Sequence, residues 1–188
     1  EQLELFRALP GDLAPRDAQD LMAYPFFSLA KTHRIAPIDF RMKDIAIRVE
    51  AVAEHGMATI WDADILIWAA TQVTEALDRG GEVSPVIRFH PYTLLKGIRR
   101  HTGGDQYRKL LEALRRLHAT SVETNIRQHG SKGRAFHWLE EWGYQEDKQG
   151  KPIGMSITLP RWLYDGIIQA GGVLTIHPDY FLLTGVIE

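Results

Sequence analysis

The chain lacks several features that whole classes of protein require. It contains no cysteine, so it has no disulfide, no thiol nucleophile and no thiolate metal ligand, which fits a reducing compartment. No apolar run approaches the roughly 20 residues that a membrane helix needs, and the start has no signal-peptide layout. We therefore predict a cytoplasmic protein that has no contact with a membrane.

Catalytic and metal-binding patterns are also missing. The eight histidines are scattered and include neither an H-x₃₋₅-H pair nor an HExxH motif. Gly103-Gly104 lacks the lysine context of a phosphate-binding loop, and no nucleophile stands in an arrangement with a base. Asp62 and Asp64 resemble a divalent-metal pair, but their place at the start of a helix favours capping. We expect no enzyme, no metal and no cofactor.

Composition indicates an ordinary globular chain. Its 188 residues are 45% hydrophobic and 24% charged, with a net charge of −2 and a pI near 6.5. This length suits one large domain or a domain with an extension, and the pI argues against indiscriminate coating of nucleic acid. Because the chain begins with Glu1 rather than Met, we expect it to be a piece of a longer protein.

The net charge of the whole chain conceals one basic segment within an otherwise acidic sequence. From Lys96 to Arg134 there are 10 Lys and Arg against 3 Asp and Glu, a balance of +7, while the remainder carries −9. A basic segment on an acidic body is typical of contact with phosphate. The alternative is a solvated face of an ordinary domain.

The order of elements in the basic segment predicts a winged helix. Val86–Phe89 reads as a strand, Pro91 begins a short helix, and Thr102–Asp105 forms a turn in which Asp105 can cap the next helix. That helix, about Gln106–His118, has an apolar stripe and a charged face. Two predicted strands follow, joined by a basic, glycine-containing tip that we interpret as the wing; they are Ser121–Ile126 and Ala135–Tyr144, and the tip is Arg127–Arg134.

Further elements complete an α+β fold, a winged helix-turn-helix with extra N-terminal and C-terminal elements. Residues 1–37 read as an N-terminal arm or cap, and residues 38–188 as the winged-helix domain. The remaining expected elements are strand-like texture over Ile38–Val52, strands at Met57–Ile60 and Ile153–Leu159, helices at Ala63–Leu77 and Arg161–Ala170, and a closing strand or turn at Leu174–Leu183.

The charged face of the helix 106–118 is mostly basic, with few groups that could read bases, so we expect backbone contact rather than base readout. The candidate DNA-binding residues are Lys96, Arg99, Arg100, Arg108, Lys109, Arg115, Arg116, Arg127, Lys132 and Arg134. Winged helices also serve as dimerisation surfaces, which is a rival role. Candidate dimer edges are Ile38–Val49 and Ile153–Leu159.

The tryptophans have two interpretations. Trp138 and Trp142 lie four apart on the expected return strand of the wing, facing the same side. Stacking on single-stranded DNA is one role for such aromatic residues. A structural role in the core is the other, and it is the interpretation that we prefer for the five tryptophans of the chain.

Several stretches resemble the replication initiator protein A family of plasmids and, more loosely, TrfA-type initiators. The resemblance spans nearly the whole chain, and its most specific part is Gly56–Ala70. The other stretches are Tyr24–Leu29, Ile87–Tyr92, Tyr107–Leu114 and Leu117–Thr120.

The resemblance implies two winged helices in tandem. The C-terminal one reads repeated origin sites, whereas the N-terminal one forms the dimer interface and, in monomers, adds contact with the DNA backbone. Dimers repress their own synthesis at operator DNA and monomers start replication. By position this chain corresponds to the N-terminal domain of a bacterial initiator, with host helicase or initiator proteins as further partners. Alternatives are a winged-helix regulator that binds DNA alone, and a module that binds only protein.

Overall fold

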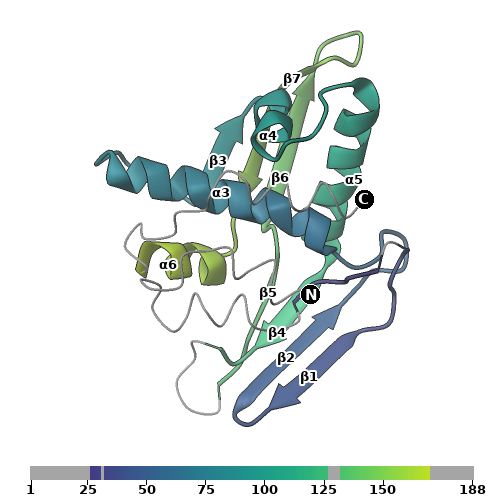
Figure 1. Cartoon of the computed structure of the whole chain (residues 1–188), viewed down its shortest axis with the longest axis vertical. Helices are drawn as coiled ribbons and strands as arrows, with labels where there is room; N and C mark the ends of the chain where they lie inside the picture. The colour runs from purple at the N-terminus through teal and green to yellow at the C-terminus, as the bar shows by residue number, and fades with distance from the viewer. Residues whose placement is uncertain (1–25, 31, 127–131, 170–188) are drawn as a thin grey trace.

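The computed structural model describes residues 26–30, 32–126 and 132–169. Figure 1 shows two antiparallel sheets with the helices around them. The labels follow Figure 1, and the described elements are β1 (Ile38–Met42), β2 (Ile45–Glu50), α3 (Ile60–Asp78), β3 (Val86–Phe89), α4 (Pro91–Gly97), α5 (Gly104–Ala119), β4 (Ser121–Thr124), β5 (Arg134–His137), β6 (Glu141–Glu146), β7 (Pro152–Thr158) and α6 (Arg161–Gln169).

A winged helix is formed by α3, α4, α5 and a three-stranded sheet. The strands of this sheet lie in the order β3-β7-β6, with β7 antiparallel to both neighbours. Along the chain the elements run helix, strand, helix, helix, strand, strand. The turn between β6 and β7, residues 147–151, therefore occupies the position of the wing beside α5 (Figure 1).

The second sheet, β1-β2-β4-β5, contains the hairpin that the sequence analysis interpreted as the wing. That interpretation is wrong, because β4 and β5 pair with each other and, through β2, with β1, rather than with the strands of the winged helix. The predicted strand Ala135–Tyr144 is divided between the two sheets. Trp138 and Leu139 are fully buried at the division, where the chain leaves one sheet and enters the other. Trp138 and Trp142 consequently do not share a strand.

Other predicted boundaries also change. Ile38–Val52 is a hairpin, in which Lys43 adopts φ 54° at the turn. Met57–Ile60 is not a strand, because Thr59 makes only an isolated bridge to Ser28 and α3 begins at the next residue. α5 begins at Gly104 and its N-cap is Gly103, not Asp105.

The core contains an aromatic cluster where the chain passes from β5 to β6. Trp138 stacks on Phe27 at 4.8 Å between ring centroids and meets Phe26 edge-on at 5.6 Å. Phe136 stacks on Trp162 of α6 at 4.9 Å, and the Trp162 indole N–H donates to the Ile126 carbonyl. The expected arm thus contributes Phe26 and Phe27 to the core, whereas residues 1–25 and the expected element Leu174–Leu183 lie outside the described residues.

Candidate nucleic-acid interface

The first helix of the helix-turn-helix, α4, is closed at both ends by its own sequence. The His90 side chain accepts a hydrogen bond from the Tyr92 amide, and Pro91 needs no acceptor at the first helical position. At the other end the Arg100 amide donates to the Leu95 carbonyl at 2.7 Å, and Arg99 adopts φ 61°. This left-handed residue stops the helix and starts the turn into α5.

α5 presents one apolar face and one charged face. Its buried residues recur at helical spacing and are Tyr107, Leu110, Ala113, Leu114 and Leu117. The opposite face carries the arginines and lysine that the sequence predicted as phosphate contacts. Their environments differ, so each must be considered by its partners.

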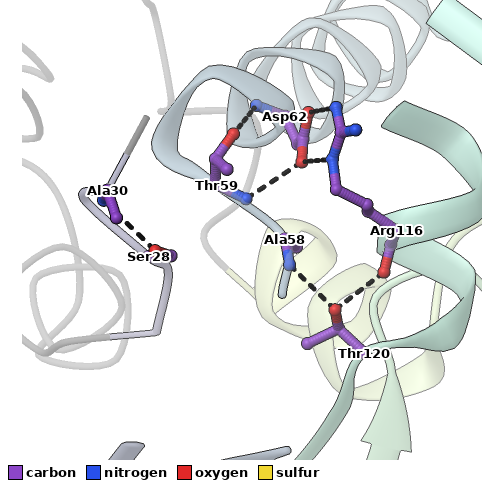
Figure 2. A network of polar contacts seen from close by, with 7 residues as sticks. All are labelled: Ser28, Ala30, Ala58, Thr59, Asp62, Arg116 and Thr120. Carbon is purple, nitrogen blue, oxygen red and sulfur yellow. Dashed lines mark hydrogen bonds and ion pairs between the residues drawn. The ribbon is translucent and has the colours of Figure 1, made fainter. Parts of the chain in front are cut away.

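Arg116 is held inside the protein. Its Nε and Nη2 donate to the two carboxylate oxygens of Asp62 at 2.8 and 2.9 Å, and its side chain is 21% exposed (Figure 2). The hydrogen bond with Asp62 raises the pKa of Arg116. Asp62 also accepts from the Thr59 amide while the Thr59 hydroxyl accepts from the Asp62 amide, which completes a capping box for α3.

A second network joins Arg116 to the start of α3 through its backbone. The Thr120 hydroxyl donates to the Arg116 carbonyl at 2.7 Å and accepts from the Ala58 amide at 2.9 Å (Figure 2). The end of α5 is therefore tied to the residues that precede α3. At this junction Asp62 both caps α3 and pairs with Arg116.

Arg100 is also engaged. Its Nη2 lies 3.3 Å from Asp64 Oδ2, and the two side chains are 13% and 0% exposed. Asp62 and Asp64 each pair with a guanidinium group, so their carboxylates are not arranged together as ligands of a divalent metal ion. Among residues 26–30, 32–126 and 132–169, no group of three His, Cys, Asp or Glu side chains could hold a metal ion.

Arg108 and Lys109 remain on the surface of α5. Arg108 lies between Asp105 at 2.6 Å and Glu112 at 3.1 Å, and Lys109 lies 3.4 Å from Asp105. The hydrogen bond from Arg108 lowers the pKa of Asp105. Because these pairs are well solvated, each contributes little to stability.

The other predicted contacts are distributed over several elements of the fold. Lys96 and Arg99 are exposed at the end of α4 and in the following turn. Arg115 is half-buried, with its guanidinium 5.9 Å from the centre of the Trp142 ring. Lys132 and Arg134 belong to the β4–β5 hairpin of the second sheet, and Arg127 lies outside the described residues. That any of the predicted residues contacts DNA stays a prediction.

The β6–β7 turn carries two cations that the sequence analysis missed, Lys148 and Lys151, both exposed. Asp147 Oδ1 accepts hydrogen bonds from the Gln149 and Lys151 amides, both at 2.9 Å, and Gly150 adopts φ 79°. The turn is therefore closed by its own residues. An Asp-Lys-Gln-Gly-Lys stretch does signal a turn, but nothing in its composition says that it neighbours α5.

Two contacts fix this wing against α5. The Tyr107 hydroxyl donates to Glu146 Oε1 at 2.8 Å, joining the first turns of α5 to the end of β6. Burial, followed by this hydrogen bond, raises the pKa of Tyr107. Farther along α5, Arg115 lies over Trp142, which itself stacks on Tyr144. The N-terminal end of α5 and the wing accordingly lie at the same end of the molecule (Figure 1).

Comparison with known proteins gives concordant results. A family model described as "Replication initiator protein A" matches residues 16–188. A protein of Wigglesworthia glossinidia brevipalpis named "Putative replication protein" is 32% identical over 172 residues, which are 89% of this chain. The chain spans 62% of the length of that relative.

Among solved structures, domains 2 and 3 of RctB match with a TM-score of 0.60 at 11% identity, over 97% of this chain and 68% of that one. The WH1 domain of MSBI1.176, a replication protein isolated from a multiple sclerosis patient, matches with a TM-score of 0.40 at 15% identity, over 60% of this chain and 86% of that one. At such identities the likeness to RctB concerns the fold alone. No helix in the described ranges has the length and apolar character to cross a membrane.

Proposed function

We propose that this chain, which belongs to the replication initiator protein A family, is the winged-helix domain through which a plasmid initiator self-associates and grips the DNA backbone at its origin and operator. It acts by binding, without catalysis and without a cofactor. Family membership supports the role in replication, since family and relative are both named for it.

The observation that carries the DNA contact is the pairing of a helix-turn-helix with a rigid, cationic wing. Arg108 and Lys109 project from the first half of α5, and Lys148 and Lys151 project from the turn that Tyr107 and Glu146 hold beside it. Exposed cations on two neighbouring elements suit the spaced phosphates of a duplex. We leave Arg100 and Arg116 out of this surface, because each already forms an ion pair with a buried carboxylate, Asp64 and Asp62 respectively, and breaking a buried ion pair is costly.

A protein-interaction module is the second candidate, and one observation favours it. The exposed cations of α5 already have carboxylates within 3.4 Å, so this face is closer to neutral than the sequence predicted. In that case host replication proteins such as the helicase would be the partners. A regulator that reads bases by itself is less well supported, because α5 exposes few amide or hydroxyl groups.

The salt dependence of duplex binding tests the proposal. We would measure the affinity of the 188-residue chain for a duplex by fluorescence anisotropy at several salt concentrations. Replacing both Lys148 and Lys151 by alanine should lower the salt slope by about 1.8, since each phosphate contact contributes about 0.9. Lys132→Ala, on the β4–β5 hairpin, is the matched control and should leave the slope unchanged.

Three other results would each contradict the proposal. A lower salt slope for Lys132→Ala alone would place the DNA contact on the β4–β5 hairpin. An affinity that stays high in salt for one duplex only would indicate a self-sufficient regulator. No binding to any duplex at low salt would indicate the protein-interaction module.

A further inference from the structure

We propose that two copies of this chain join through β1, with the two strands antiparallel about a two-fold axis at Phe40, so that the sheets β1-β2-β4-β5 of both copies become continuous. This inference rests on the proposed self-association and specifies its surface. The pairing would use the backbone edge of β1 and the side chains that this edge brings together.

β1 is an edge strand. It pairs with β2 through five residues, and no strand of the described ranges pairs with its other side. An unpaired edge offers backbone N–H and C=O groups to another strand. β1 also carries an exposed apolar residue, Met42, which is 49% exposed, and Ile35, which precedes it in the chain, is 54% exposed.

The sequence of β1 is complementary to itself when the copies run antiparallel. With Phe40 opposite Phe40 of the second copy, Ile38 faces Met42 and Asp39 faces Arg41, and each pair occurs twice because of the symmetry. Opposite charges directly across an antiparallel pair stabilise it, and like charges destabilise it. Shifting the register by one residue would instead place apolar side chains on the opposite face of the sheet from the core.

The charges on this face are arranged to allow that contact. Asp39 lies 3.3 Å from Arg48, which also binds Glu50, so the carboxylate of Asp39 shares its cation with another group. Arg41 is exposed, and the described part of the chain gives it no ion pair. An Asp39 carboxylate of the second copy would therefore meet a guanidinium with no competing partner there.

The other strand edges fit self-pairing less well. The sequence also predicted a dimer edge at Ile153–Leu159. This segment is mostly β7, which is the central strand of its sheet and is paired on both sides. β6 would place Glu141 opposite Glu146 and has a register irregularity at Gln145 and Glu146. β3 and β5 are each only four residues long. Of the described edges, β1 alone combines length, regular pairing and opposite charges in self-register.

Charge reversal tests this surface in the 188-residue chain, by sedimentation over a wide range of concentrations. Asp39→Arg puts arginine opposite arginine, and Arg41→Asp puts aspartate opposite aspartate, so each should raise the dimer dissociation constant about 10- to 100-fold. An equal mixture of the two variants should restore the wild-type constant, because the introduced arginine of one chain then faces the introduced aspartate of the other. Glu50→Arg, which also removes a carboxylate from Arg48 but lies on β2, is the control and should change nothing.

Restoration in the mixture would support the β1 pairing, because neither chain is repaired internally. Wild-type dimers that both single variants leave intact would overturn the β1 surface while the proposed self-association stands. A wild-type chain that stays monomeric at every concentration would overturn both. Measuring duplex binding of the same samples separately keeps the proposed DNA contact independent of these outcomes.

Discussion

Two arginines of the same helix illustrate how burial decides the role of a residue. Arg108 and Arg116 are both on the charged face of α5, yet Arg108 is 62% exposed beside exposed acids and Arg116 is 21% exposed against a carboxylate that is 3% exposed. A solvated pair contributes little, whereas removing one member of a buried pair leaves an uncompensated charge.

Arg116→Met should therefore lower the free energy of unfolding by about 2–4 kcal/mol, because Asp62 loses its cation but keeps its place in the capping box. Arg108→Met, with the same change of side chain, should cost less than about 0.5 kcal/mol. Urea unfolding of both variants checks this. Equal losses would show that the ion pair with Asp62 contributes no more than a surface pair.

The raised pKa of Tyr107 predicts that the free energy of unfolding depends on pH. Burial and the hydrogen bond to Glu146 raise its pKa, so the folded state retains the proton more firmly than the unfolded state. The resulting stabilisation is complete below the unfolded pKa of about 10 and is lost as the pH rises through the folded pKa. The difference in unfolding free energy between wild type and Tyr107→Phe should narrow above pH ~10. A difference that is the same at pH ~7 and pH ~10.5 would contradict this assignment.

At the scale of elements, α3 and α4 make a close contact that depends on one glycine. A Cβ at Gly97 would lie 2.5 Å from Trp68 Nε1 and 2.7 Å from Trp68 Cδ1. Trp68 is 6% exposed and also meets Phe89 edge-on at 5.0 Å, so its ring has little room to move. The last turn of α4 can approach α3 because the side chain is absent.

Gly97→Ala should accordingly lower the free energy of unfolding by about 1–3 kcal/mol, the usual cost of overpacking. Gly104→Ala, at the first helical position of α5, is the matched control, since a Cβ there meets nothing within 4 Å. It should be neutral or stabilise by up to about 1 kcal/mol. Thermal unfolding of the two variants, followed by circular dichroism, distinguishes them. Similar melting temperatures would contradict the packing argument.

Elements were predicted well wherever the signal is local. α4 and α6 begin where proline, capping and periodicity place them, and α5 follows its apolar stripe to within two residues at its start. Strand pairing is not local, so the sequence pattern merged β5 and β6 into one predicted strand and favoured the first hairpin after α5 as the wing. The true wing is separated from α5 by β4 and β5.

At the scale of the whole molecule, Trp138 joins the two sheets. It is fully buried between β5 and β6, and its ring meets Phe26, Phe27, Phe136 and Trp162. One contiguous core thus lies beneath both sheets, which predicts that they unfold together.

Urea unfolding of the wild type should give one transition, with coincident curves by far-ultraviolet circular dichroism and tryptophan fluorescence. Trp138→Ala should shift that single transition by about 3–5 kcal/mol, because a large cavity forms where the sheets meet. Two separated transitions in the wild type would show that the β1-β2-β4-β5 sheet is an independent unit.

By itself the sequence determined the α+β class, the helix-turn-helix, the basic segment and the likeness to replication initiators, because each depends on local pattern or on matching residues. Only the tertiary structure decided which hairpin is the wing and which arginines face solvent. The pairing of β7 with β3 and β6, and the approach of Asp62 and Asp64 to Arg116 and Arg100, join residues far apart in the chain. Composition and residue spacing cannot predict such contacts, because the packing of the whole chain determines which strand or charge lies beside another.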